Sequence, residues 1–310
     1  MEVIADLHLH SKYSRAVSPQ MMIPQISLWA IRKGINLLGT GDFTHPLWFK
    51  ELKADLKEVG EGLYQSNKDS DQNIGKKPLF IFSAEISSIY SQEGKSHRVH
   101  NVVLAPSFKI VEEVNNQLRK HGMNLMSDGR PITGLSSQQI CEIVFSVSKD
   151  CLIIPAHIWT PWYSLYGSNS GFNSLRECFG DFADQIYGIE TGLSSDPAMN
   201  WRVEELDKRS ILSFSDAHSL QKLGREATIF NLDKPLRSYQ QVKQAIINQQ
   251  IAYTIEFHPE EGKYHWTGHR LCGVKQSPEQ TVKMGTICPV CGKKLTVGVM
   301  HRIEELGQRS

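Results

Sequence analysis

The sequence predicts an α/β protein in which a barrel of parallel strands and helices precedes a small cysteine-rich module. Strand and helix patterns alternate from residue 2 to about residue 257, with short links between them. Such alternation is typical of a (β/α) barrel, and a doubly wound open sheet is the alternative. Beyond residue 263 the composition changes, and three of the six cysteines lie between residues 272 and 291. We therefore expect two domains, residues 1–257 and residues 258–310.

Short apolar runs rich in Ile and Val mark the expected strands, because strands of a parallel sheet are buried on both faces. The runs cover residues 2–7, 35–41, 79–85, 99–105, 152–157, 186–190, 211–215, 227–232 and 251–255. Apolar residues at helical spacing follow within 24–33, 135–147 and 238–249. In the second of these helices, Ser136 and Gln139 match a capping box.

The bulk composition is that of an ordinary globular protein, with 40% hydrophobic and 22% charged residues among 310. No apolar run approaches the length of a membrane span and no secretory signal opens the chain, so we expect a cytoplasmic protein without a membrane partner. Residues 263–310 carry eight Lys or Arg and three Glu. This basic tail favours contact with nucleic acid, although a merely solvated tail has the same composition.

Histidines and carboxylates gather at the ends of the expected strands. The histidines in this position are six of the chain's twelve. The whole set is His8, His10, Asp42, His45, Glu85, His100, His157, Asp216 and His218. One histidine at a strand end is usually structural, but a repeated pattern is how a barrel assembles a metal cluster in its mouth. We therefore expect these residues to bind metal.

The chemistry of this set favours hydrolysis of phosphate esters. His8 and His10 lie two residues apart on a strand, so both rings are expected on one face. Asp216 and His218 repeat this spacing, and Glu85 can bridge two ions. We expect two or three divalent cations (Zn, Mn, Mg or Fe), and we assign catalysis to Asp216, His218, His8 and Glu85. Clustered cations neutralise a phosphate and activate a bound water.

The terminal cysteines predict a second metal site. Cys288 and Cys291 are separated by two residues and precede a glycine, which is the spacing of a zinc knuckle, and Cys272 supplies a third thiolate. His269 has the same spacing to Cys272 and is the preferred fourth ligand, with His265 as the alternative. Three thiolates and one imidazole indicate a closed structural Zn²⁺ site. Basic residues around it could then touch DNA phosphates.

The strand-end residues resemble the polymerase and histidinol phosphatase (PHP) superfamily of phosphoesterases over roughly residues 1–257. The matching residues are Asp6-Leu-His8-Leu-His10, the Gly39-Thr-Gly-Asp42 turn, Glu85, His100, His157 and Asp216-Ala-His218. The resemblance implies a distorted (β/α)7 barrel with up to three metals. Two positions depart from it: Arg15 stands where many members have an Asp ligand, and Phe43 where many have His. A third ion would then depend on Asp42 or His45.

A tighter resemblance, to the endonuclease Q family, includes the terminal module. It rests on Ser11-Lys-Tyr-Ser14-Arg15-Ala, Gly39-Thr-Gly-Asp-Phe-Thr-His45-Pro46, Gly268-His-Arg-Leu-Cys272 and Ile287-Cys-Pro-Val-Cys-Gly292. The resemblance implies a metal-dependent DNA repair endonuclease that cuts 5′ of a deaminated base (hypoxanthine, uracil or xanthine) or of an abasic site. Its substrate partner would be damaged DNA, and partner proteins cannot be identified from the sequence. Members extend further as helices, so we expect the module to continue beyond residue 310.

A long aromatic loop, residues 158–175, follows His157 and is expected to border the lesion. Aromatic rings can stack with a base that has been flipped out of a duplex. The alternative is that the rings only cover the barrel rim. We assign substrate binding to Arg15, Trp48, Trp159, Trp162, Tyr163, Tyr166, Arg270 and Lys293.

Two rival functions use the same sequence features. A small-molecule phosphatase of the histidinol phosphatase type would need the metal ligands, but neither the zinc module nor the aromatic loop. A non-catalytic nucleic-acid-binding module would not need so complete a ligand set. The DNA endonuclease is therefore the leading prediction.

Overall fold

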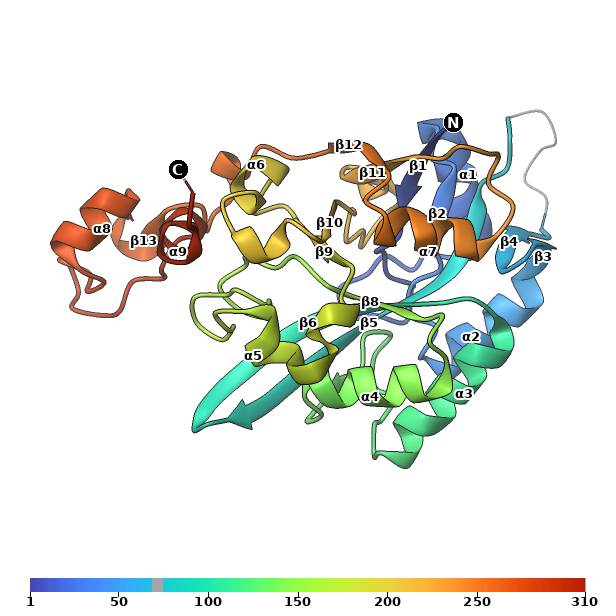
Figure 1. Cartoon of the computed structure of the whole chain (residues 1–310), viewed down its shortest axis with the longest axis horizontal. Helices are drawn as coiled ribbons and strands as arrows, with labels where there is room; N and C mark the ends of the chain where they lie inside the picture. Colours follow the sequence, from blue (N-terminus) through green and yellow to red (C-terminus); the bar gives the residue numbers. More distant parts are fainter. Residues whose placement is uncertain (69–74, 310) are drawn as a thin grey trace.

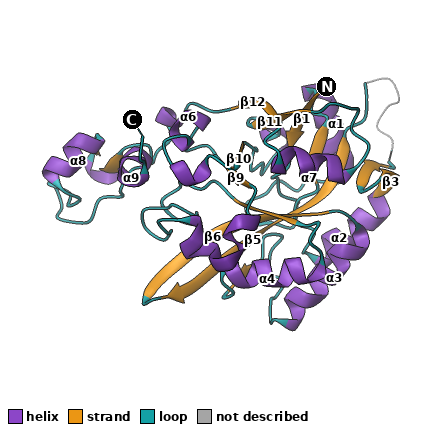
Figure 2. Ribbon diagram, in the orientation of Figure 1, coloured by secondary structure: helices purple, strands orange, loops and turns teal. Residues whose placement is uncertain are grey.

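The computed structural model describes residues 1–68 and 75–309. It is a mixed α/β structure in which helices flank a central sheet, and a smaller C-terminal part protrudes from one side (Figures 1 and 2). Within the described residues, no helix is both long enough and apolar enough to cross a membrane.

The largest sheet of the described chain has ten strands. They are β1 (Glu2–Asp6), β2 (Leu37–Gly39), β3 (Leu56–Gly60), β4 (Leu63–Ser66), β5 (Leu79–Gln92), β6 (Lys95–Ala105), β7 (Ile132–Thr133), β8 (Leu152–Pro155), β11 (Ala227–Asn231) and β12 (Ile251–Ile255). Beside it, β9 (Gly188–Glu190) pairs in parallel with β10 (Ser210–Leu212). Every strand that the sequence predicts is present.

The expectation that all these strands are parallel is wrong. β2 is parallel to β1 and β5, but β6 is antiparallel to β5 and β8, and β11 is antiparallel to β1 and β12. β5 and β6 form a long hairpin whose two connecting residues, Glu93 and Gly94, have φ of 50° and 77°. Two consecutive residues with positive φ make the tight turn that reverses a strand, whereas a parallel connection needs a long crossover.

The helices expected from apolar spacing are confirmed as α1, α4 and α7. The helices are α1 (Ile23–Lys33), α2 (Pro46–Asp55), α3 (Phe108–Lys120), α4 (Ser137–Val147), α5 (Leu175–Phe179), α6 (Pro197–Asn200), α7 (Tyr239–Ile247), α8 (Pro278–Met284) and α9 (Val299–Leu306). α4 begins with the expected capping box, since the Ser136 side chain accepts from Gln139 N and the Gln139 side chain accepts from Ser136 N. The cap satisfies backbone donors that the first turn leaves free.

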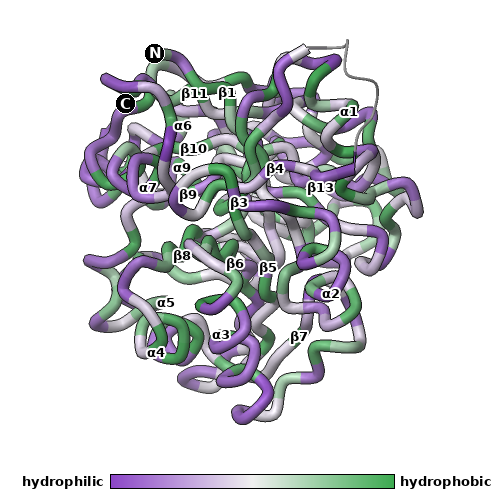
Figure 3. Tube along the Cα trace, turned by 90° about the vertical axis from the view of Figure 1, so that its right-hand side faces the viewer, coloured by the Kyte–Doolittle hydropathy of each residue, from purple (hydrophilic) through white to green (hydrophobic). Residues whose placement is uncertain are grey.

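The central strands are buried on both faces. Successive residues of β6 and β8 alternate between two apolar clusters: Val102 and Leu104 join the smaller one, and Val103 joins the larger. This is the period-two alternation of a strand with a core on each side. Hydrophobic segments accordingly run through the middle of the molecule, among β5, β6 and β8 (Figure 3).

Hydrogen bonds beyond the sheet ladders link the segments that follow β8, β9 and β10. They run from Ile158 N to Glu190 O, from Thr191 N to Leu212 O and from Ser213 N to Thr228 Oγ1, over 3.0, 2.9 and 2.9 Å. The segment after β1 joins this group, because Leu9 pairs with Ala217 in an isolated parallel bridge. Residues that are distant in sequence therefore meet at one end of the strands.

The C-terminal part is tied to the main body through α9. It also contains β13 (Thr267–His269), β14 (Val274–Gln276) and α8. Val299 and Ile303 of α9 are buried in the larger apolar cluster. Arg302 donates to the carbonyl oxygens of Tyr166 and Phe172, both 3.1 Å away, and so joins α9 to the 158–175 loop.

Candidate active site

Seven of the predicted ligands form one cluster. Their donor atoms fall into three overlapping groups, each within 4.8 Å: His8, His10 and Glu85; His10, Asp216 and His218; Glu85, His100 and His157. β5 and β6 carry Glu85 and His100, and the segments after β1, β8 and β10 carry the rest. Because His10 and Glu85 each belong to two groups, the three groups are continuous.

Glu85 lies at the centre of the cluster. Its Oε1 is 2.7 Å from His100 Nδ1 and 3.3 Å from His157 Nε2, while its Oε2 is 3.2 Å from an Arg130 nitrogen. Burial alone would raise the pKa of Glu85, but His100, His8 and Arg130 hold it well below its usual value. The carboxylate is therefore ionised and is available to a cation.

An unpaired nitrogen supports a metal in this cluster. His8 Nε2 is buried and has no hydrogen-bond partner in the described structure. It faces two carboxylates, Glu85 Oε1 at 3.6 Å and Asp216 Oδ1 at 3.7 Å. The other ring nitrogen, Nδ1, is 2.9 Å from Glu190 Oε1, which favours the tautomer with a lone pair on Nε2. A lone pair directed at two carboxylates fits a divalent cation between them.

Glu190 and Asp42 orient the histidines from behind. Glu190 holds His8 and also accepts from the backbone N–H of His157 at 3.0 Å. Asp42 Oδ1 is 3.0 Å from His10 Nδ1, and its Oδ2 accepts from Ser11. Glu190 was not predicted as a site residue, although it ends an apolar strand.

Two predicted ligands lie outside the three groups. Asp42, predicted as a ligand, is the buried partner of His10 described above, and its carboxylate oxygens are occupied by that ring and by hydroxyl donors. His45 caps α2 and stacks on Tyr13, with ring centroids 4.5 Å apart. We therefore assign an orienting role to Asp42 and a capping role to His45.

Three residues around this cluster have an unusual backbone conformation. Asp42, His157 and Asp216 have φ of 50°, 32° and 45°. Residues other than glycine rarely adopt positive φ, and each such conformation costs energy that the surrounding structure must supply. The fold thus imposes these conformations where the side chains must converge.

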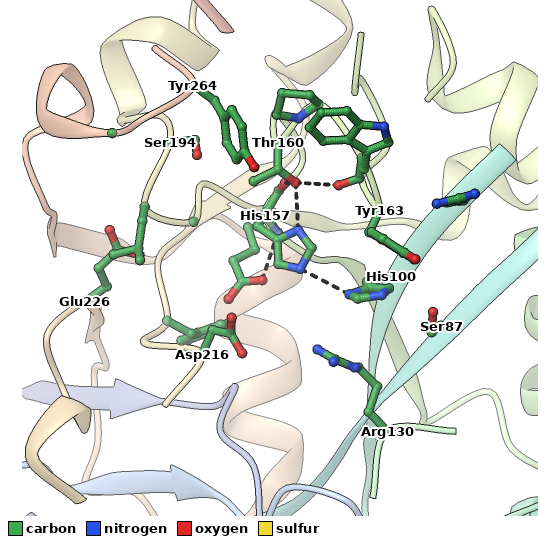
Figure 4. A pocket seen from close by; sticks show the side chains of 18 of the residues that line it. Ser87, His100, Arg130, His157, Thr160, Tyr163, Ser194, Asp216, Glu226 and Tyr264 are labelled. Atoms are coloured by element: carbon green, nitrogen blue, oxygen red, sulfur yellow. Dashed lines mark hydrogen bonds between the residues drawn. The ribbon is translucent and has the colours of Figure 1, made fainter. Parts of the chain in front are cut away.

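The cluster borders a pocket of about 810 Å³ with basic and aromatic walls. Arg15, Arg98 and Arg130 line it together with Trp162 and Tyr163. In Figure 4, His157 lies in the middle of the pocket, with Asp216 below it and His100 and Arg130 to one side. The arginine side chains of such a pocket could bind phosphates, and its aromatic rings could stack on a base.

The prediction that Trp48, Trp159 and Tyr166 bind substrate is wrong. All three side chains are fully buried. Their polar atoms donate within the protein: Trp48 to Gly41 O, Trp159 to Asn200 Oδ1 and Tyr166 to Glu205 Oε1. These rings pack the core because their N–H and O–H groups find partners there. Four residues of the aromatic loop were predicted to bind substrate, and two of them, Trp162 and Tyr163, line the pocket.

The terminal cysteines also converge. Donor atoms of His269, Cys272, Cys288 and Cys291 lie within 4.8 Å of one another, whereas His265 is buried outside this group. Desolvation would raise the pKa of Cys288, but backbone N–H groups of Cys291 and Val290 and the His269 ring lower it to about 6. A thiolate forms readily under these conditions, as a zinc ligand requires. Arg270 and Lys293 are exposed nearby.

Comparison with known proteins places the chain in a family. No family model matches it. The uncharacterized protein YqxK of Bacillus subtilis is 31% identical over 99% of this chain and 78% of its own length. The crystal structure of the lesion-specific endonuclease PfuEndoQ from Pyrococcus furiosus is similar to this chain, with a TM-score of 0.85 and 34% identity. The match covers all of this chain and 72% of the PfuEndoQ chain. The chain belongs to the endonuclease Q family.

A second endonuclease Q structure, a complex with a 27-mer duplex carrying an abasic lesion at the active site, gives a TM-score of 0.84 at 33% identity. This chain covers 73% of that endonuclease Q chain. PsfC from Pseudomonas syringae, at 13% identity and a TM-score of 0.51, shares the fold alone. Membership of the endonuclease Q family makes the chain a metal-dependent hydrolase of phosphodiester bonds.

Proposed function

We propose that this chain nicks DNA on the 5′ side of a deaminated base or an abasic site. One observation carries the proposal: seven ligand-type side chains converge beside a pocket lined by three arginines. The whole of this chain also matches the structure of a lesion-specific endonuclease. The arginines supply the charge that binds a nucleic acid backbone. The pocket is large enough to receive a flipped nucleotide.

Two or three divalent cations would be held by His8, His10, Glu85, His100, His157, Asp216 and His218. When bound, they would neutralise the phosphate and make an attacking water more acidic. Glu190 and Asp42 keep the rings of His8 and His10 in the tautomer and orientation that a ligand needs. Arg130, beside Glu85, faces the same pocket and would bind the phosphate being cut.

The exposed aromatic residues would hold the lesion. Trp162 is 36% exposed at the pocket, and the Tyr163 ring lies 4.8 Å from that of His100. Stacking on such rings stabilises a flipped base by about 1–3 kcal/mol. Arg15 and Arg98 would bind flanking phosphates, and Arg270 and Lys293 would reach the duplex further away.

The two expected domains and their metals form part of the same proposal. The hydrogen bonds that join β8, β9, β10 and β11 support a distorted (β/α)7 barrel over residues 1–257. The clustered donors of His269, Cys272, Cys288 and Cys291 support one structural Zn²⁺ in residues 258–310. A rigid knob of this kind would serve a polymer substrate, whereas a small phosphate ester would not need it.

An end-labelled duplex with one deoxyinosine, deoxyuridine or abasic site tests the function. With Mn²⁺ or Mg²⁺ we expect a single nick 5′ of the lesion, and an undamaged duplex should remain intact. Turnover of p-nitrophenyl phosphate without nicking would favour a small-molecule phosphatase. Binding without any cleavage would favour a non-catalytic module.

A further inference from the structure

One buried acid in the pocket wall has no role in the metal cluster. Glu226 directly precedes β11, and its side chain is 1% exposed although it lines the pocket with Gly192, Leu193 and Phe214. In the view of Figure 4, it lies on the opposite side of Asp216 from His100 and Arg130. It is not among the grouped ligands of the described chain. Glu226 therefore belongs to the part of the pocket wall that lies beyond the metal cluster.

The two oxygens of Glu226 are not equivalent. Oε1 accepts the backbone N–H of Phe257 at 3.3 Å. Oε2 is buried and has no partner among the described residues. Leaving a buried oxygen unpaired is unfavourable, so a group of this kind calls for an explanation such as a ligand.

The surroundings favour the neutral carboxylic acid. Burial, together with the neighbouring carboxylates Glu256 and Glu190, raises the pKa of Glu226 to about 9, and the Phe257 N–H and Arg225 offset only part of this rise. Asp216 and Lys263 also line the pocket. Because Oε1 already accepts a hydrogen bond, the proton belongs on Oε2. The pocket wall therefore presents an O–H donor.

Deamination of adenine or cytosine changes the group that such a donor would meet. Adenine and cytosine carry an exocyclic amine, which donates hydrogen bonds. Hypoxanthine and uracil carry a carbonyl oxygen in that place, which accepts them. A fixed O–H donor pairs with the carbonyl, but meets the amine as donor against donor.

Building on the function proposed above, we propose that Glu226 distinguishes hypoxanthine from adenine, and uracil from cytosine, by donating a hydrogen bond from Oε2 to the exocyclic oxygen that deamination creates. A site built around one buried hydrogen bond discriminates strongly, because the wrong partner leaves buried polar groups unpaired. An abasic nucleotide has no base to pair, so its cleavage does not depend on Glu226. This difference separates recognition of the base from the chemistry of the cut.

Two substitutions test the proposal on matched duplexes with deoxyinosine, deoxyuridine, an abasic analogue or deoxyadenosine. Glu226→Leu removes the donor, and we expect cleavage at deoxyinosine and deoxyuridine to fall about tenfold or more while abasic cleavage persists. Glu226→Gln can accept from Phe257 N–H through its amide oxygen and donate through its amide nitrogen. It should therefore cleave all three lesions within about threefold of the unmodified protein and still spare deoxyadenosine.

Asp55→Asn is the matched control, because Asp55 is a second buried acid and does not line this pocket. Equal losses on abasic and deaminated substrates in Glu226→Gln would overturn the proposal and indicate an acid that acts in the chemical step. Unchanged cleavage of deoxyinosine in Glu226→Leu would also overturn it. If the unmodified protein cuts none of the three lesions, the proposed function itself fails, whatever the variants do.

Discussion

The two clusters of metal-binding side chains are built in opposite ways. The cluster in the main body collects residues from positions 8 to 218, and the strands of the sheet bring them together. The terminal cluster takes its four residues from positions 269 to 291, on turns and short elements. Apolar residues beside it are exposed, including Leu271 at 94%.

This difference indicates which cluster depends on its ion. In the main body, Glu190, Asp42 and Arg130 hold the ligands through hydrogen bonds and charge, and a large core surrounds them. The terminal part has little buried apolar surface of its own around the cysteines. A small module without a core needs a metal to fold. On the proposed function, the fold would organise the first cluster, whereas bound zinc would organise the fold around the second.

The largest expected effect comes from breaking the first cluster. Asp216→Ala should reduce nicking by about 100-fold or more, because it removes a carboxylate that two histidines face. Binding to lesion DNA should persist, since the arginines and rings remain. Single-turnover cleavage and an electrophoretic shift assay measure the two effects. Asp184→Ala, at an aspartate on the surface, is the control, and near-normal cutting by Asp216→Ala would refute the assignment.

Breaking the second cluster should have a large but local effect. Cys288→Ser should release one zinc per chain and speed hydrogen exchange over residues 263–298. α9 should remain protected, because Val299 and Ile303 are buried in the main core. Metal analysis and hydrogen-exchange mass spectrometry measure both. Cys141→Ser, in the buried face of α4, should instead keep the zinc and weaken the main body. Unchanged zinc content in Cys288→Ser would contradict the proposed zinc site in the terminal module.

A smaller effect should follow from loosening the first cluster without removing a ligand. Glu190→Gln weakens the hold on His8 Nδ1, and we expect cleavage to fall about 10-fold to 100-fold, the usual cost of losing such a partner. Added Mn²⁺ should restore part of the rate if the defect lies in metal affinity. A titration of cleavage against Mn²⁺ measures this. Equal cleavage rates of Glu190→Gln at low and high Mn²⁺ would show that Glu190 does not act through metal affinity.

The smallest expected effect is an opposite dependence on pH: stability of the main body should fall as pH rises, whereas zinc retention by the terminal cluster should improve. Glu226 has a folded pKa of about 9 against a usual 4.5, so its contribution to stability is present below pH 4.5 and is lost as pH rises towards 9. Cys288, with a pKa of about 6, should hold zinc better over the same rise. Thermal melts and zinc retention against a chelator, both from pH 5 to 9, measure the two trends. Glu226→Gln should flatten the first trend and leave the second unchanged.

The sequence predicts the elements and the ligand set better than it predicts their surroundings. The strand-end pattern identified seven side chains that meet in space, because apolar runs mark the buried strands and the histidines and carboxylates beside them are distinct from those runs. It could not show that Asp42 stands behind His10, or that Trp159 turns into the core, since either orientation fits the same sequence. The hairpin of β5 and β6 was missed because both strands continue into a polar stretch, residues 91–98, which separates the two apolar runs.

The left-handed backbone at Asp42, His157 and Asp216 sets stability against activity in this fold. A conformation of this kind costs about 1–3 kcal/mol, which the rest of the molecule must offset. Glycine at such a position would relieve the strain and at the same time delete the functional side chain. Selection for stability alone would therefore favour glycine at these positions, so the presence of a histidine and two aspartates there is a mark of use.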